Sequence, residues 1–305
     1  AKRQAADEAS ASLAPRPEDI SFDSGLWANF RFFKHRNYDH DKSREDLLTH
    51  SVWSDTRVWG RWTYQTGEMK KDKRRHFVFV RLKNIYVTRG GLAPGERFDN
   101  RGPLLDYGYT ALDLNPWKIE AGRRYFNIGR GFVFSGVQDG VQINYQVPGW
   151  NIGAFASRSL PRADNIDTSV PGYDKYGRRY FSGLGIGYAG IRDHHLYGYA
   201  VVERDRSRER PEDPAQEYGY QAEYFALGAK GQWGKNWPYW VEAVRQTGHS
   251  REYPSNALSD ISAWAFDAEQ KYLTMTRSRL ACSLEYAAAS GDPDRGSVND
   301  TLYGN

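Results

Sequence analysis

Apolar and polar residues alternate along most of this chain, in segments of about ten residues, the length at which a tilted strand crosses a bilayer. The pattern is plain where Val141, Ile143 and Tyr145 alternate with Gln142 and Asn144. Longer charged stretches join these segments at one end, and short turn signals join them at the other, near Pro116, Gly149, Asp193, Asn236 and Arg277. Short turns at one rim and long polar loops at the other are typical of an outer-membrane β-barrel.

The alternation predicts strands near residues 24–34, 55–64, 76–88, 105–114, 140–147, 151–157, 183–188, 224–230, 264–272 and 279–289. With the N-terminus in the periplasm and a short turn after every second strand from the fourth on, residues 279–289 form the thirteenth strand and residues 301–305 begin a fourteenth. Bacterial single-chain barrels have even strand numbers, and an open edge in lipid leaves backbone groups unsatisfied. We therefore expect an all-β, transmembrane up-and-down antiparallel β-barrel, with about 13–14 of some 16–18 strands in this sequence.

The domain organisation follows from the same pattern. Residues 1–22 are rich in Ala, Ser and charged residues and are expected to form a periplasmic N-terminal tail. Residues 23–305 are expected to be the transmembrane barrel, with its C-terminal strands missing from the sequence. A soluble β-sandwich would have strands of about five or six residues, and a propeller would need four strands in each repeat, whereas two are found here.

Charge indicates which face of each strand meets lipid. Arg or Lys costs about 2–4 kcal/mol on the lipid face at mid-bilayer. The strands near 55–64 and 76–88 place Arg57, Arg61, Arg81 and Lys83 opposite their apolar residues. The charged face is therefore expected to line the lumen.

Composition agrees with a barrel and excludes several other classes. The mean hydropathy of −0.77 is too low for membrane helices, whereas 21 Tyr and 10 Trp suit the aromatic girdles of a barrel. A net charge of +4 gives no nucleic-acid signal, and the single Cys282 excludes an internal disulfide. No cofactor, metal site or enzyme activity is predicted. A solvated acidic loop is favoured over a Ca²⁺ site for Asp292, Asp294 and Asp300.

Three sequence blocks carry a resemblance to a known family. They are the segment 117–126 (WKIEAGRRYF), Gly129-Arg130-Gly131 with the following 139–145 (DGVQINY), and the segment 286–292 (YAAASGD). In these blocks and their spacing the chain resembles the alginate-export family of outer-membrane barrels, over roughly residues 23–305. The resemblance implies a location in the bacterial outer membrane and passive movement of an anionic polymer through a lumen lined with arginines.

Basic residues that alternation places inward are the candidate path for that polymer: Arg31, Arg57, Arg61, Arg81 and Lys83. Arg123, Arg124 and Arg130 match the family's Gly-Arg block, and the facing of the adjacent pair stays open because both cannot point inward without a bulge. Guanidinium groups bind carboxylates through two parallel hydrogen bonds, and a lumen lined with positive charge raises the local concentration of anions. The alternative is a structural ion-pair network, in which these residues pair with Asp55, Asp106, Glu120, Asp267 and Glu269.

The expected function is thus an outer-membrane channel for diffusion or export of anionic solutes or polysaccharide through an arginine-rich lumen. Its expected partners are outer-membrane lipid and lipopolysaccharide, and anionic saccharides or small anions, with no nucleic acid. The alternative function is a structural barrel that sheathes or anchors another cell-envelope component, which would bring an envelope protein as a further partner.

Overall fold

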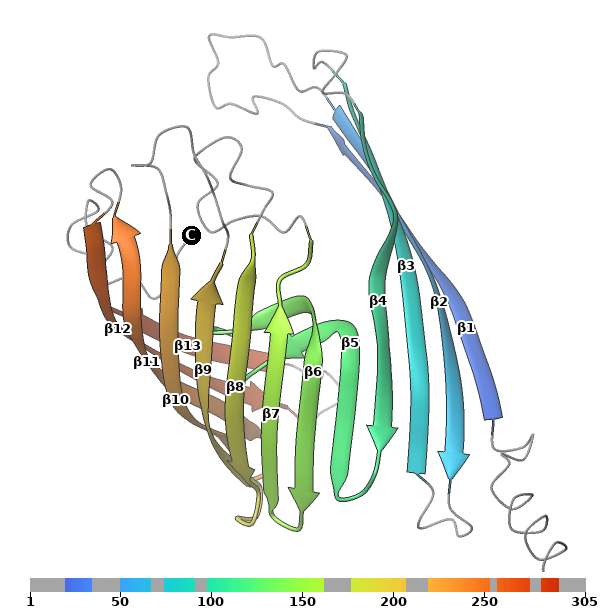
Figure 1. Cartoon of the computed structure of the whole chain (residues 1–305). Coiled ribbons are helices and arrows are strands. Elements are labelled where there is room, and N and C mark those ends of the chain that lie inside the picture. Colours follow the sequence, from blue (N-terminus) through green and yellow to red (C-terminus); the bar gives the residue numbers. More distant parts are fainter. Residues whose placement is uncertain are drawn as a thin grey trace, which may run out of the picture. The chain divides into compact units, whose positions relative to one another are not determined.

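A computed structural model describes residues 20–34, 50–66, 74–90, 98–161, 177–206, 219–252, 257–274 and 281–290 (Figure 1). The described part is all β, and no helix in it is long and apolar enough to cross a membrane. The chain divides into two compact units, Ala1–Asp113 and Leu114–Asn305. The strands are β1 Ile20–Lys34, β2 His50–Thr66, β3 Arg74–Gly90 and β4 Phe98–Asp113 in the first unit, and β5 Trp117–Asn127, β6 Ser135–Val147, β7 Trp150–Arg158, β8 Arg179–Tyr188, β9 His194–Asp205, β10 Tyr220–Trp233, β11 Trp237–Glu252, β12 Ala257–Leu273 and β13 Ala281–Ala289 in the second.

The first unit is an antiparallel meander in which each strand pairs with its neighbour in the sequence. Directly paired residues share a face, so the register Trp27↔Arg57↔Lys83 puts these three side chains together. Leu26↔Val58↔Leu82 forms the next row, on the opposite, apolar face. The register between β3 and β4 shifts after Arg81, and the bulge inserts Asp106 into the charged face.

The second unit continues the up-and-down order from β5 to β13. Its described short turns lie between β4 and β5, β6 and β7, β8 and β9, and β10 and β11, at the first four predicted positions. Three of them contain left-handed residues, Gly149 with φ 79°, Asp193 with φ 62° and Gly234 with φ 63°. The fifth predicted turn, near Arg277, lies outside the described residues.

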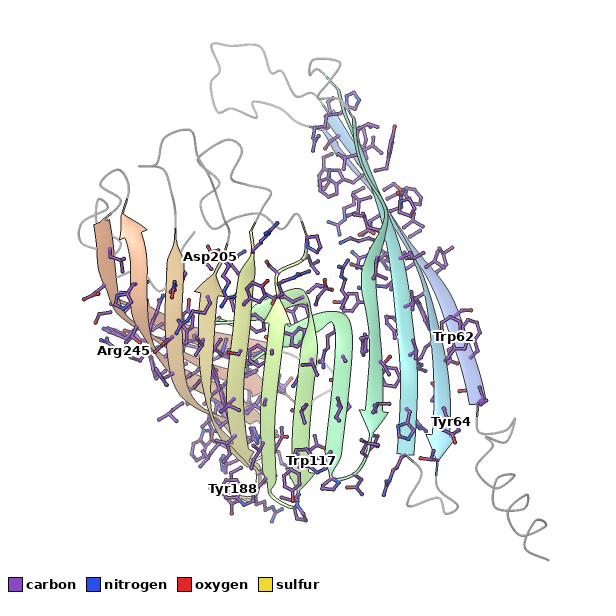
Figure 2. The ribbon with its side chains drawn as sticks, in the orientation of Figure 1. Trp62, Tyr64, Trp117, Tyr188, Asp205 and Arg245 are labelled. Carbon is purple, nitrogen blue, oxygen red and sulfur yellow. The ribbon has the colours of Figure 1, made fainter. Side chains whose placement is uncertain are left out.

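Aromatic pairs mark the short-turn end of the second unit, on the face away from the lumen. Trp117 lies 4.7 Å from Tyr145 between ring centroids, and Trp150 lies 4.5 Å from Tyr188. A third Trp–Tyr pair, Trp237 with Tyr272, repeats the arrangement at 4.6 Å on β11 and β12. Figure 2 shows Trp117 and Tyr188 at this end of the strands. Amphipathic rings at one height are the girdle that a barrel places at the membrane interface.

The buried core of the second unit lies on the inward face of the sheet. It is formed by Phe126, Phe134, Phe155, Phe181, Tyr199, Val201, Tyr220, Ala222, Tyr224, Ala226, Val244, Ile261, Ala263 and Ala265. The opposite face leaves large apolar side chains exposed, among them Leu184 at 64% and Leu227 at 74%. Exposed apolar residues outside and packed residues inside are the distribution expected for a wall facing lipid.

The predicted strands are confirmed, and most are longer than predicted. β2 begins at His50, where the alternation indicated residue 55, and β4 begins at Phe98, where it indicated 105. β1 begins at Ile20, inside the segment 1–22 that was expected to be the tail; residues 1–19 lie outside the described part of the chain. The predicted fourteenth strand, residues 301–305, also lies outside it, so the total of 16–18 strands stays a prediction.

Ile143 and Asn144 provide a direct test of the two faces. Ile143 pairs with Ile119 and Ala154 on the lipid face, whereas Asn144 points inward. Replacing Ile143 with arginine should cost about 2–4 kcal/mol and reduce the folded fraction in the outer membrane. The measure is the heat-modifiable migration of the folded barrel on gels. Asn144→Arg is the matched control and should assemble normally; equal assembly of both variants would show the register to be wrong.

Candidate functional site

The loop between β5 and β6, residues Ile128–Phe134, folds into the lumen. Gly129 has φ 57° and Gly131 has φ 91°, a conformation that other residues rarely adopt. A Cβ atom on Gly129 would lie 2.2 Å from Glu242 Oε2 and 2.5 Å from the Tyr199 ring. Glycine at this position therefore allows the backbone to approach the wall closely, which explains the Gly129-Arg130-Gly131 motif.

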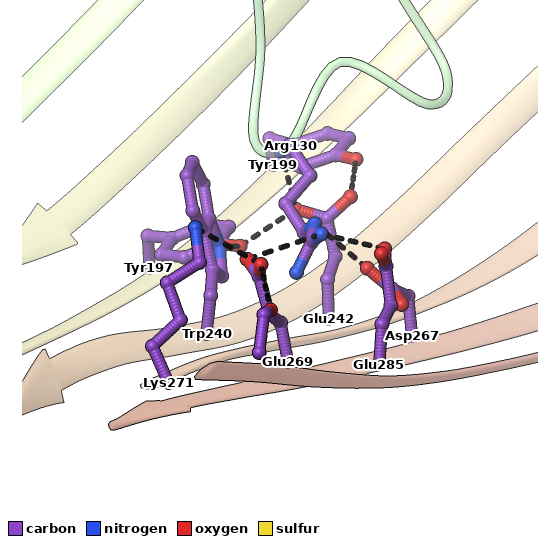
Figure 3. A network of polar contacts seen from close by, with 10 residues as sticks. Arg130, Tyr197, Tyr199, Trp240, Glu242, Asp267, Glu269, Lys271 and Glu285 are labelled. Atoms are coloured by element: carbon purple, nitrogen blue, oxygen red, sulfur yellow. Dashed lines mark hydrogen bonds and ion pairs between the residues drawn. The ribbon is translucent and has the colours of Figure 1, made fainter. Parts of the chain in front are cut away.

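Arg130 extends from this loop to the carboxylates of β12 and β13 (Figure 3). Its Nε lies 2.7 Å from Asp267 Oδ2, and its Nη2 lies 2.8 Å from Glu285 Oε1 and 3.5 Å from Glu269 Oε2. The backbone N–H of Arg130 donates to Glu242 Oε2 at 2.9 Å. The side chain is 12% exposed, so this contact is largely shielded from water.

Aromatic residues hold Glu242 in place. Its carboxylate is 1% exposed and accepts hydrogen bonds from the Tyr197 hydroxyl at 2.6 Å and the Tyr199 hydroxyl at 2.8 Å. Trp240 Nε1 donates to the Tyr197 hydroxyl. The Trp240 ring also has the Arg130 guanidinium 5.5 Å and the Lys230 ammonium 4.9 Å from its centroid, which is within cation–π range. This arrangement surrounds the loop tip with fixed polar and aromatic groups.

Phe134 anchors the other end of the loop. Its ring lies 5.0 Å from Phe155 and 4.7 Å from Phe181, and Phe126 is 6.2 Å away. These rings belong to the buried inward face of β5, β7 and β8. The loop is thus fixed on the inward face by an apolar contact at Phe134 and by ion pairs at Arg130.

A cavity of about 350 Å³ lies beside the loop on its lumenal side. Asn127 at the end of β5 and the loop residues Ile128 and Gly129 form part of its wall. The polar groups of the strands that line it are Gln142, Asn144, Asn151, His195, Tyr197, Lys230 and Trp240. Amide, imidazole, hydroxyl and ammonium groups together can hydrogen-bond a hydroxylated solute. In the described part of the chain, no group of three or more His, Cys, Asp or Glu is arranged to hold a metal ion.

The first unit brings together the predicted basic residues on one face. Asp106, 5% exposed, receives three cations: Arg81 Nε at 2.7 Å, Lys83 Nζ at 3.2 Å and Arg57 Nη1 at 3.6 Å. Arg57 also forms two hydrogen bonds with Asp55, at 3.0 and 2.7 Å. The guanidinium of Arg81 lies 4.1 Å from the Tyr107 ring centroid.

The two remaining candidates of this face are less enclosed. Arg61 pairs with Asp23 at 2.7 Å, and each side chain is 47% exposed. Arg31 is exposed and forms no ion pair with any described residue. The five predicted cations therefore meet three carboxylates, Asp23, Asp55 and Asp106, and this set keeps two positive charges in excess.

The register settles the facing of the adjacent arginines. Arg123 pairs with Asp139, in line with Ala121 and Ile119 on the apolar outer face, and its Nε and Nη2 donate to that carboxylate at 2.8 and 2.9 Å. Arg124 lies on the inward face, where it contacts the buried Glu120. The prediction that Arg123 lines the lumen is therefore corrected: without a bulge in β5, two consecutive residues take opposite faces.

The ion-pair network is the alternative that the geometry supports. All five carboxylates considered for it, Asp55, Asp106, Glu120, Asp267 and Glu269, contact the predicted basic residues. Sequence reasoning missed Glu242, Glu285 and Phe134. Alternation along β11 places Glu242 on the same inward face as Trp240 and Val244, so the sequence could have indicated it as a lumenal residue. The contact between Glu242 and the β5–β6 loop could not be predicted from the sequence.

The alginate export family matches residues 81–304 of this chain, which includes the inward loop and every strand of the second unit. The chain belongs to the alginate export family. Its place is accordingly the bacterial outer membrane, its fold is the up-and-down β-barrel, and its role is that of an outer-membrane channel or export protein. Members of this family are channels or transporters, which is the class of protein that the sequence predicts.

Solved structures similar to this family member include two outer-membrane proteins. OmpT of Vibrio cholerae, in its trimer form, is 9% identical, with a TM-score of 0.42, and the match covers 91% of this chain and 92% of that one. OmpF of Salmonella typhi, in complex with daunomycin, is 11% identical, with a TM-score of 0.37 and coverage of 88% and 97%. No curated protein matches.

Removing the Arg130 side chain should release the loop of this export-family barrel. Arg130→Ala removes the cation that pairs with Asp267 and Glu285, whereas Glu269 keeps Lys271 at 2.9 Å. Breaking a shielded ion pair costs about 3–5 kcal/mol. Amides of residues 128–134 should then exchange hydrogen about two orders of magnitude faster, and single-channel conductance should rise. Arg192→Ala, at a turn where the side chain is 95% exposed, is the control. Unchanged exchange and conductance would contradict the anchoring role.

Proposed function

We propose that this chain forms a channel through which anionic saccharides diffuse or are exported, guided by the basic face of the first unit. The observation that carries the proposal is the cluster around Asp106, where one buried carboxylate holds Arg57, Arg81 and Lys83. The cluster fixes the cations in position without cancelling their charge. A fixed positive excess in a water-filled lumen with low-dielectric walls raises the local concentration of anions.

The ion-pair network and the cationic lining are compatible. An isolated arginine side chain pays rotamer entropy when it binds a ligand, whereas one already held by a carboxylate has less freedom to lose. Asp55 and Asp106 hold Arg57 in this way, and Tyr107 stacks against Arg81. Guanidinium groups in such positions can still donate to a passing carboxylate through their unused N–H groups.

The cavity beside the inward loop supports a hydroxyl-rich solute. Gln142, Asn144 and Asn151 present amides from β6 and β7, and Lys230 adds a positive charge from β10. A polyuronate carries both carboxylate and hydroxyl groups, so a cavity that offers both an ammonium group and amides matches that chemistry. The family's export role is consistent with this substrate class.

The proposal is tested by charge reversal at the two cations that do not hold Asp106. Arg31→Glu with Arg61→Glu changes the charge by four units and leaves the Asp106 cluster intact. In planar bilayers with a KCl gradient, the reversal potential should shift toward cation selectivity, and block by uronate oligosaccharides should weaken by about tenfold or more.

The matched control places the same charge change at the short-turn rim, with Arg192→Glu and Lys235→Glu, both exposed. The control should keep the wild-type selectivity. An equal shift in both double variants would mean that the rim sets selectivity and would contradict the proposal. A folded wild-type barrel that shows no conductance would favour the scaffold function, in which an envelope partner fills the lumen.

A further inference from the structure

The lipid-facing wall of the second unit carries a groove of about 770 Å³. It runs over the outward face of β7 to β12, on the side opposite the inward loop. Its walls are apolar except at one point. Among its lining residues, all in the described part of the chain, Arg245 is the only charged one.

The groove arises from an alternation of side-chain size between neighbouring strands. β9 and β11 present small residues outward, namely Gly198, Ala200 and Ala243. At the same register, β8, β10 and β12 present bulky ones, namely Leu184, Ile186, Phe225, Leu227, Trp264 and Phe266. The bulky strands form ridges and the small ones form furrows between them. Furrows of this shape accommodate extended hydrocarbon chains, since a flexible chain gains dispersion contacts on three sides.

Arg245 lies at the outer end of one furrow. On β11 it lies two positions after Ala243 and eight positions after Trp237 of the aromatic girdle. Its partner on β12, Trp264, is likewise eight positions from Tyr272 of the girdle. Eight residues at about 3.3 Å each, in a tilted strand, cover most of an apolar band about 25 Å tall. Arg245 and Trp264 are therefore at the outer boundary of the hydrocarbon, where lipid phosphates lie.

The partners of Arg245 leave its charge unneutralised. Its Nη2 donates to Ser262 Oγ at 2.5 Å, and no described carboxylate forms an ion pair with it. The comparable outward arginine of β9, Arg204, is paired with Glu223 at 2.8 Å. A guanidinium facing lipid without a counterion is costly unless an anionic group from the surroundings meets it.

We propose that this groove binds lipopolysaccharide through its lipid A part, with a lipid A phosphate on Arg245 and acyl chains in the furrows beside Ala243 and Ala200. Two features support this occupant over a general lipid coat. The unpaired cation lies at the outer-leaflet boundary, and guanidinium binds phosphate with two parallel hydrogen bonds. The furrows are multiple and adjacent, which matches one headgroup that carries several chains.

The test measures lipid A binding to the full chain in phosphatidylcholine nanodiscs. Bisphosphorylated lipid A should bind at least ten times more tightly to the wild type than to Arg245→Glu. Arg192→Glu, at the short-turn rim, should bind as the wild type does. Ala243→Phe fills the furrow on the outward face and should also weaken lipid A binding, without touching the charge. Heat-modifiable migration on gels confirms that each variant is folded.

Two ligand controls separate the outcomes. Dephosphorylated lipid A should bind more weakly and with the same affinity to the wild type and to Arg245→Glu, which would assign the contact to the phosphate. If it binds as tightly as lipid A, the groove recognises only hydrocarbon and the proposal fails. If phosphatidylglycerol matches lipid A in affinity and in its dependence on Arg245, the site takes phospholipid and the assignment to lipopolysaccharide is overturned.

Discussion

The exclusion of charge from hydrocarbon is the constraint on which the rest of this structure depends. Period-two alternation offers each strand two faces, and nearly every charge within the membrane height takes the inward one. Arg123, the exception on β5, is neutralised by two hydrogen bonds to Asp139 beside it. The inward face then becomes crowded with ions, which must find partners because burying an unpaired charge is costly. Ion pairs thus organise the interior of a protein whose exterior is organised by lipid.

This crowding produces two kinds of site. Around Asp106 the cations come from neighbouring strands, β2 and β3, so the cluster is local and follows from the sheet register. Around Arg130 the cation comes from a loop and the carboxylates come from β11, β12 and β13. The first site lines a wall with fixed positive charge, and the second one attaches a loop inside the lumen. One fold therefore supplies both a fixed basic face and a fixed inward loop from the same electrostatic requirement.

The sequence allowed the local features to be predicted and left the long-range ones open. Strand positions, short turns and the apolar face follow from alternation, and the facing of Arg123 and Arg124 was already contained in the parity of Ile119 and Ala121. Asp106 reaches its three cations through a bulge that alternation alone does not indicate. The contacts of the inward loop depend on which strands curve to face it, and no pattern within the loop specifies Glu242 or Phe155 as neighbours.

The contacts of Arg130 also bear on the order in which the barrel assembles. Its backbone meets Glu242, 112 residues later in the chain, and its side chain meets Glu285, 155 residues later. Such contacts form only when β11 to β13 are in place, because the long stretch of chain between the contacting residues must be ordered first. The inward loop therefore reaches its final position only after β11 to β13 have formed. An assembly intermediate without β13 would lack the Glu285 contact, and Asp267 and Glu269 of β12 would be the carboxylates left to hold the Arg130 side chain.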